Sequence, residues 1–471
     1  MPTNGPPLRI VDGEFRIGGQ AAWTKRVTWS WFQAQLPPSL APTFGPAITR
    51  FAPGLAGPGL TDDLETVADG MAPGSVFYHH YGLWYDRRRV DHNYYGSPDQ
   101  RTGEVWAPFV ELPWARSGQG KAWDGLSKYD LTRFNPWFFD RVRAFGDLAD
   151  QRGFVLYANT YFQHWLLESR AHYVDFPWRP QNTIQTTGLP DQVPAAETFY
   201  DLSDPVRRDL HRRYIRHTLD SLKGVNNVVY GIDREYTGPQ SFVEFWLDTI
   251  AEWERENRAD VFVALEIPKA QMDALLADPR RRAQVDAIGF HSWVYRPDGS
   301  LFAVQGGINR APRQQLGDIV RPEDAPEGAD RAAIANTLWA SSPAMRYRAL
   351  REYRDRWPGL VILLADDGFP ALSAAVEAQW PAEVRASLRP SDQIAASGET
   401  WAVEGGGRTL VYSLGAPATL SAPTTRPLTA SWALPGRTEP LVTQISPGAA
   451  ALTPPPEAAG GAWAVMLSPS A

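Results

Sequence analysis

The chain has 471 residues, of which 43% are hydrophobic, a formal net charge of −7 and no cysteine. This length exceeds one ordinary core and indicates two or three domains. The acidic balance disfavours a nucleic-acid partner, which would need a basic face. The lack of cysteine excludes disulfides, thiol nucleophiles and thiolate metal sites.

No apolar run approaches the roughly 18 residues of a membrane span, so no membrane partner is expected. Met1–Arg9 shows no charged region followed by an apolar one, as a signal peptide would. We favour a periplasmic or extracellular location with a signal removed. The cytoplasm is the alternative, and the sequence leaves the oligomeric state unknown.

Residues 1–25 predict a short β-rich leader. The runs Leu8–Val11 and Glu14–Ile17 flank the dipeptide Asp12-Gly13. An Asp-Gly pair between short runs of alternating apolar residues is a hairpin signal.

From residue 26 to about 400, strand-like runs alternate with helical patterns. This alternation predicts a mostly parallel sheet. An eighth strand at Thr400–Val403 would complete a closed (β/α)8 TIM barrel, an α/β fold. The seven clearer runs are Val27–Phe32, Val76–His80, Phe154–Asn159, Val228–Asp233, Val261–Leu265, Ala287–His291 and Val361–Leu364.

Helices are predicted between these strands from capping signals and apolar spacing. The first begins at Asn135-Pro136 and ends at Gly153; a fourth covers about 344–356. The second begins at Asp204-Pro205, with its apolar face formed by Val206, Leu210, Tyr214 and Leu222. The third begins at Ser241 and buries Phe242, Phe245, Ile250 and Trp253.

Two other segments differ in texture from the alternating pattern. Residues 81–135 form a long insertion that is rich in Tyr, Trp, Arg, Asp and Gly, and a loop of this length suggests function. Residues 401–471 carry short apolar runs between Pro-, Thr- and Gly-rich turns, without helical periodicity. They predict a small all-β domain, a β-sandwich.

Catalytic residues of a TIM barrel lie where its strands end. Asp233-Arg234-Glu235 follows the fourth predicted strand, and Asp366-Asp367 follows the seventh. Glycoside hydrolysis needs two carboxyl groups across the scissile bond, and we expect Glu235 and Asp366 to face each other. The alternatives are a surface ion pair of Glu235 with Arg234, and Asp367 as the second carboxylate.

Aromatic residues are the other notable feature, with 19 Trp, 17 Tyr and 20 Phe. Such an excess favours sugar binding, because a pyranose stacks on an aromatic ring; the alternative is barrel packing. The Arg87–Arg89 run could bind a sugar carboxylate or simply pair with local acids. We expect substrate contacts from His80, Trp84, Tyr85, Arg88, Asp124, Lys128, Gln163, His164, Trp178, Arg179, Asp233, Arg234, His291, Trp293 and Tyr295. No cofactor and no catalytic metal are expected, since no carboxylate stands at zinc-ligand spacing from His79, His80 or His92.

The segment Asn227–Tyr236 resembles the fourth-strand segment of clan A glycoside hydrolases, in which the last glutamate of N-V-x-Y-E-x-x-N-E is the acid/base. The helix from Phe242 to Glu254 is similar to one in bacterial apiosidase-like and neighbouring families. The resemblance implies that Glu235 is the acid/base and that a nucleophile stands at Asp366. The chain departs from the pattern of the clan at two positions. It has Arg234 where the clan has Asn, and Asp366 where the clan has Glu.

The sequence therefore predicts a glycosidase that acts on a complex poly- or oligosaccharide, with uronate-containing sugars among its candidate substrates, by a retaining mechanism. A carbohydrate-binding pseudoenzyme is one alternative, motivated by the missing glutamate at the seventh strand. A polysaccharide lyase is the other, motivated by Arg87–Arg89 and His164.

Overall fold

The computed structural model divides the chain into two compact units. The first comprises Met1–Ser292, Val304–Arg313 and Gly359–Leu363, and the second Trp293–Ala303, Gln314–Pro358 and Leu364–Ala471. The structure describes residues 5–23, 26–27, 63–79, 112–123, 125–167, 173, 176–233, 236–289, 293–295, 301–303, 308–309, 353, 356–363, 389–390, 400–413, 417–434, 437, 439–458 and 463–470. Within these ranges, no helix combines the length and apolar composition that a membrane span requires.

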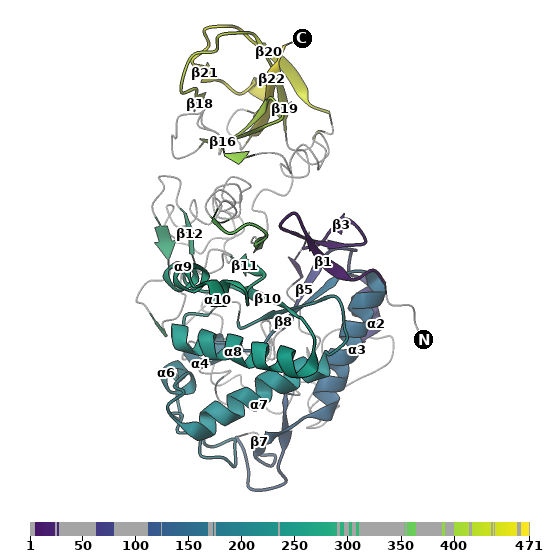
Figure 1. Cartoon of the computed structure of the whole chain (residues 1–471), viewed down its shortest axis with the longest axis vertical. Coiled ribbons are helices and arrows are strands. Elements are labelled where there is room, and N and C mark those ends of the chain that lie inside the picture. The colour runs from purple at the N-terminus through teal and green to yellow at the C-terminus, as the bar shows by residue number, and fades with distance from the viewer. Residues whose placement is uncertain are drawn as a thin grey trace, which may run out of the picture. The chain divides into compact units, whose positions relative to one another are not determined.

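A seven-stranded parallel sheet forms the centre of the first unit (Figure 1). Its strands lie side by side in chain order, and every neighbouring pair is parallel. Each overlaps one of the seven clearer predicted runs. They are β4 (Arg26–Val27), β5 (Val76–His79), β8 (Val155–Asn159), β9 (Val228–Gly231), β10 (Phe262–Leu265), β11 (Ala287–Gly289) and β14 (Val361–Leu363).

The unbroken order of the strands makes the sheet curl. Parallel neighbours are joined by right-handed crossovers, so a sheet whose order never reverses carries its crossover helices on one face. The other face must then be covered by the sheet itself, as in a (β/α)8 barrel. The described strands therefore form a curled, half-barrel sheet.

The prediction of an eighth barrel strand at Thr400–Val403 is wrong. These residues lie in β16 (Thr400–Gly405), which pairs antiparallel with β17 (Arg408–Ser413). The turn between them is Gly406-Gly407, whose φ angles of 58° and 73° suit a two-residue hairpin. A parallel neighbour would instead need a crossover of about a dozen residues or more.

The predicted N-terminal hairpin is confirmed. Strands β1 (Leu8–Val11) and β2 (Glu14–Ile17) pair antiparallel with Val11 opposite Glu14, and β3 (Gln20–Ala21) extends the sheet. Asp12 and Gly13 both have positive φ, 53° and 74°. These values form the mirror-image turn that matches the twist of the flanking strands.

This hairpin contributes to the core of the curled sheet. Its Leu8, Phe15 and Ile17 pack against the inward side chains of the parallel strands, namely Val76, Tyr78, Val155, Tyr157, Val229, Ala264, Ala287, Val361 and Leu363. The Leu8 amide donates a hydrogen bond of 2.8 Å to Oδ1 of Asn227, which directly precedes β9. The hairpin thus lies at the amino ends of the strands and leaves the carboxyl ends for a site.

Three long helices, α3 (Pro136–Arg152), α7 (Pro205–Ser221) and α8 (Gln240–Asn257), lie side by side (Figure 1). Asn135 and Asp204 cap α3 and α7 as predicted, and Gly153 ends α3 with φ of 74°. The outward ring of Phe77 on β5 packs against Phe145 of α3. The shorter helices are α2 (Leu64–Asp69), α4 (His164–Leu167), α6 (Ala196–Phe199), α9 (Lys269–Ala277) and α10 (Pro279–Arg282).

The predicted apolar face of α7 is wrong at its first member. Val206 is 48% exposed, whereas Arg207, Leu210 and Tyr214 are buried. Successive helical residues are rotated by about 100°, so burying Arg207 turns Val206 outward. On α8, Phe242, Ile250 and Trp253 are buried as predicted, while Phe245 is half-buried. The fourth predicted helix is described only at Tyr353 and Arg356.

The predicted insertion at 81–135 carries regular structure in its described part. Strands β6 (Trp114–Arg116) and β7 (Tyr129–Phe134) form an antiparallel ribbon. Tyr129 also bridges to Thr183, so the ribbon is held by a second segment of the first unit. Residues 81–111 lie outside the described ranges.

The second unit is built from antiparallel sheets. Its strand β22 (Trp463–Pro469) lies in a six-stranded sheet of order β15-β16-β17-β22-β19-β20. Ala418 and Leu452 of a two-stranded ribbon share one core with Trp432 and Trp463 of that sheet. The remaining elements are β12 (Trp293–Tyr295), β13 (Leu301–Ala303), β15 (Arg389–Pro390), β18 (Ala418–Thr419), β19 (Leu428–Ala433), β20 (Leu441–Ile445), β21 (Ala451–Leu452) and η6 (Pro456–Ala458). The β-sandwich and the boundary at residue 400 stay predictions.

Truncating the hairpin's central aromatic side chain should destabilise the first unit. Phe15 is 1% exposed and its ring contacts Trp23 and Phe262. We expect Phe15→Ala to lower the free energy of unfolding by about 3–5 kcal/mol, because it removes contacts and leaves a cavity. Urea unfolding followed by tryptophan fluorescence measures the change.

The control for this variant is Val11→Ala in the same hairpin, where the side chain is 41% exposed. A surface change of this kind should stay within about 0.5 kcal/mol of the parent. Equal effects of the two substitutions would show that the hairpin does not belong to the core of the parallel sheet.

Candidate active site

Three polar side chains are buried where neighbouring strands of the parallel sheet end. Asn159 is the last residue of β8, Asp233 lies two residues beyond β9, and Glu266 directly follows β10. Their exposures are 4%, 0% and 4%. Polar groups are rarely buried at the end of an apolar strand without a partner or a function. This edge is also where the active sites of β/α barrels lie.

Glu266 is the carboxylate that sequence reasoning missed. Ala264 pairs with both Gly231 and Ala287, so two residues further on Glu266 lies in one row with Asp233 and Gly289. The Tyr78 hydroxyl donates to Glu266 Oε1 at 3.3 Å. A Cβ at Gly289 would lie 2.6 Å from Glu266 Cγ, so this glycine makes room for the glutamate.

A sequence signal for Glu266 was present. It follows the predicted run Val261–Leu265 just as Asp233 ends the preceding run. The predicted catalytic carboxylates, in contrast, follow only the fourth and the seventh runs. Applying the same rule to every strand would have found it.

Asn159 is the second residue missed, and neither its carbonyl oxygen nor its amide nitrogen has a hydrogen-bond partner among the described residues. Its Oδ1 and the Tyr157 hydroxyl lie over Gly231, since a Cβ there would be 2.7 Å and 2.6 Å from them. A buried, unpaired carboxamide costs free energy. A bound water or ligand hydroxyl, which both donates and accepts, would satisfy both of its polar atoms.

Gln163, predicted as a substrate contact, lies on the segment that follows β8 and contacts the segment that follows β9. Its backbone N–H donates to Asp233 Oδ2. Its Nε2 donates to Thr237 Oγ1 at 2.7 Å, and its Oε1 accepts from the Thr237 N–H at 3.0 Å. Gln163 therefore contacts both ends of residues 233–237.

Tyr236 fixes the far end of that segment. Its hydroxyl donates to the Pro239 carbonyl at 2.7 Å, and its ring meets those of Tyr200 and Phe242. Burial, followed by the charge of Asp233, raises the pKa of Tyr236 well above its usual range. The phenol is thus neutral near pH 7 and acts as an anchor.

The other predicted substrate contacts that the structure describes are held by protein groups. Lys128 Nζ donates to the Pro180 carbonyl at 3.2 Å, and Arg179 Nε to the Asp191 carbonyl at 2.9 Å. Trp178 is fully buried and stacks on His211 with centroids 4.6 Å apart. The face of Trp178 is therefore occupied by a protein ring.

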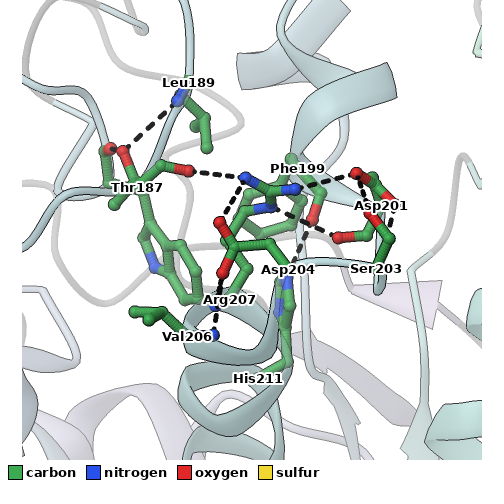
Figure 2. Close-up of polar contacts among 10 residues, drawn as sticks. Thr187, Leu189, Phe199, Asp201, Ser203, Asp204, Val206, Arg207 and His211 are labelled. Atoms are coloured by element: carbon green, nitrogen blue, oxygen red, sulfur yellow. Dashed lines mark hydrogen bonds and ion pairs between the residues drawn. The ribbon is translucent and has the colours of Figure 1, made fainter.

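His211 and Arg207 belong to a structural network at the start of α7, shown in Figure 2. Arg207 pairs with Asp201 and Asp204 and also donates to the Thr187 carbonyl. His211 Nε2 is 2.8 Å from the Phe199 carbonyl. Mainly through burial, and also through the charge of Arg207, the pKa of His211 falls to about 3. The ring is neutral and belongs to the core.

The aromatic excess serves packing among the described residues. Six tryptophans are among the largest fully buried side chains: Trp114, Trp165, Trp178, Trp246, Trp253 and Trp463. The Trp246 indole N–H donates to Thr160 Oγ1 at 3.0 Å, which ties α8 to the end of β8. For these six rings the packing alternative replaces the expected sugar contact, because their surfaces are already covered.

Several predicted site residues lie outside the described ranges: His80, Trp84, Tyr85, Arg88, Asp124, Arg234, Glu235, His291 and Asp366, as does the Arg87–Arg89 run. The same holds for the side chains of His164, Trp293 and Tyr295. In the backbone, Trp293 and Tyr295 of β12 pair with Ala303 and Leu301 of β13. Among described side chains, no cluster of three His, Asp or Glu could hold a metal ion.

Residues 2–379 match a family described as Domain of unknown function (DUF6298). The chain belongs to this family. A search of curated proteins finds no match to this DUF6298 protein.

Solved structures similar to the DUF6298 chain include a glycoside hydrolase family 5 protein from Bacteroides vulgatus, with 11% identity, coverage of 98% of this chain and 93% of that one, and a TM-score of 0.47. A second structure, called a glycoside hydrolase, has 9% identity, coverage of 99% and 97%, and a TM-score of 0.46. A family 44 endoglucanase from Clostridium thermocellum has 9% identity, coverage of 86% and 82%, and a TM-score of 0.30.

The buried His79, at the end of β5, should make the free energy of unfolding decrease as the pH falls. Burial lowers its pKa from 6.5 to about 3, and its ring packs on Phe138 of α3. The unfolded chain then binds a proton that the folded chain does not, so stability is retained above pH 6.5 and lost as the pH falls towards 3. Between pH 7 and pH 5, we expect the free energy of unfolding of His79→Phe to fall by about 2 kcal/mol less than that of the parent.

Urea unfolding at pH 8, 7, 6 and 5 measures this difference. At pH 8 the histidine is neutral in both states, so that measurement isolates the packing effect of the substitution. Parallel stability curves for the parent and His79→Phe would contradict a buried neutral histidine.

Proposed function

We propose that this protein is a glycoside hydrolase in which Glu235 is the catalytic acid/base. The observation that supports the proposal most directly is the placement of residues 233 and 236–237. They follow β9 at the carboxyl edge of the parallel sheet and are buried and hydrogen-bonded on both sides of position 235. A general acid must be held within hydrogen-bond reach of the leaving oxygen.

The buried carboxylates next to this position support the same role. Asp233 lies two residues before Glu235, and Glu266 lies beside Asp233 in the row across the strands. Negative charges in a buried site disfavour ionisation of a further carboxyl group. A general acid must carry its proton before the leaving oxygen departs, and we propose that the carboxyl groups of Asp233 and Glu266 serve to favour this protonated form of Glu235.

Other features of the enzyme would be formed by residues outside the described ranges. We propose that the half-barrel closes into a (β/α)8 barrel with its eighth strand outside the described ranges, and that the chain is related to apiosidase-like and neighbouring families. Asp366 would supply the second carboxylate. The substrate would be a complex poly- or oligosaccharide, with uronates bound by the Arg87–Arg89 run, and the enzyme would act outside the cytosol.

Replacing Glu235 should remove most of the activity. We expect Glu235→Gln to lower kcat about 10²–10⁴-fold on glycosides with poor leaving groups, because it removes general acid catalysis. The parent is first screened on aryl glycosides and polysaccharides by reducing ends, with absorbance in the ultraviolet to detect unsaturated lyase products.

The matched control is Glu256→Gln on α8, which changes an exposed glutamate paired with Arg216. It should keep parental turnover. Normal turnover by Glu235→Gln would contradict the assignment. Unsaturated products would favour the lyase, and binding of oligosaccharide without turnover would favour the pseudoenzyme.

The stereochemistry of the product should show whether the second carboxylate acts as a nucleophile or activates water. Carboxyl groups about 5–5.5 Å apart give retention, and a separation of about 6.5–9.5 Å gives inversion through water. We expect retention, as the clan resemblance implies. NMR of the first-formed anomer decides, and an inverted product would remove Asp366 as the nucleophile.

A further inference from the structure

Gln163 connects two strands at the place where the proposed acid/base stands. It lies four residues after β8, whereas Asp233 and Thr237 follow the neighbouring strand β9. All three residues are at most 1% exposed. Because water is excluded, the three hydrogen bonds between Gln163 and these two residues face no competition from solvent.

The contact with Thr237 needs a carboxamide. Gln163 accepts from the Thr237 N–H through Oε1 and contacts Thr237 Oγ1 through Nε2, at 3.0 Å and 2.7 Å. An amide presents an acceptor and a donor side by side in one plane. Two bonds to neighbouring atoms of one residue fix both the position and the orientation of its backbone.

The backbone around positions 234–235 is also held by other groups. On the β9 side, the N–H groups of Thr160 and Tyr161 donate to the carbonyls of Gly231 and Ile232 at 2.8 Å and 2.9 Å. On the other side, the Thr237 carbonyl accepts from the N–H of Asn309 at 2.8 Å. Residues 234–235 therefore connect two anchored points, and Gln163 binds both of them.

The next residue leaves little room for the backbone to shift. The Gly238 carbonyl accepts from Gln271 Nε2 at 2.9 Å. A Cβ at Gly238 would lie 2.6 Å from the ring of Tyr236, so the chain turns tightly against that ring. The backbone at Gly238 is therefore held in place as well as that at Thr237.

We propose that Gln163 is a positioning residue for Glu235: it holds the segment 233–237 so that the acid meets the leaving oxygen. This inference rests on the proposed function. It replaces the direct sugar contact that the sequence predicted for Gln163, because both atoms of its carboxamide are bound to Thr237. A displacement of about 1 Å can cost about 10²-fold in rate.

The test uses Gln163→Met, which keeps the length of the side chain and its backbone bond to Asp233 but loses both bonds to Thr237. The probes are phenyl and dinitrophenyl glycosides of a sugar that the parent hydrolyses. The phenyl substrate needs a proton from the general acid as its glycosidic bond breaks, because phenolate is a poor leaving group. Dinitrophenolate is a good leaving group and departs without that proton. We expect kcat to fall about 10²-fold on the phenyl substrate and to change little on the dinitrophenyl substrate. Thr237→Ser, which keeps the hydroxyl, should behave as the parent.

The matched control is Gln185→Met. The Gln185 carboxamide bonds to the Leu131 N–H, to Thr183 Oγ1 and to Asp130 Oδ1 at the β6–β7 ribbon, and none of these three partners belongs to residues 233–237. Gln185→Met loses a comparable set of hydrogen bonds, but none of the bonds between Gln163 and residues 233–237. We therefore expect the ratio of its rates on the phenyl and dinitrophenyl substrates to equal that of the parent. Equal losses on both substrates in Gln163→Met would overturn the positioning role.

A second measurement separates this inference from the proposed function. Hydrogen exchange of the amides in 234–237, followed by mass spectrometry, should be at least about tenfold faster in Gln163→Met than in the parent and unchanged in Gln185→Met. If the parent hydrolyses no glycoside, the proposed function fails while exchange still reports whether Gln163 holds the segment. Unchanged exchange in Gln163→Met would overturn the inference whatever the activity.

Discussion

In a parallel sheet all strands run in one direction, so the residues that end them collect at a single edge. The strands β8, β9 and β10 are adjacent and parallel, so Asn159, Asp233 and Glu266 at their carboxyl ends are neighbours. All three residues are buried. Every feature of the candidate site depends on that shared direction. An antiparallel neighbour would have placed one of these groups at the opposite edge.

The same strands have different surroundings along their length. Towards their amino ends the inward residues are apolar and pack against Leu8, Phe15 and Ile17 of the hairpin. Towards the carboxyl ends of β8, β9, β10 and β11 the inward residues are small or polar, with Gly231 and Gly289 making room for larger side chains. The core at one end supplies stability, so that buried polar groups, which cost free energy, can be maintained at the other.

The network of Gln163 shows how the fold supports chemistry without contacting a substrate. Its carboxamide is bound to Thr237 and its backbone to Asp233, so it organises the backbone around position 235 from the neighbouring strand. Sites are most accurate when such supporting bonds are themselves buried. In the proposed glycosidase, the reach of Glu235 would thus depend on the β8 end as much as on β9.

Local signals in the sequence were sufficient for elements that short-range chemistry determines. The Asp12-Gly13 turn, the Asn135 and Asp204 caps and seven parallel strands follow from neighbours in the chain. Which side of α7 is buried, which sheet receives Thr400–Gly405, and what Gln163 and Trp178 contact depend on residues far away in sequence. Only tertiary packing decides these, because burial and hydrogen-bond partners are properties of the assembled neighbours rather than of the local pattern.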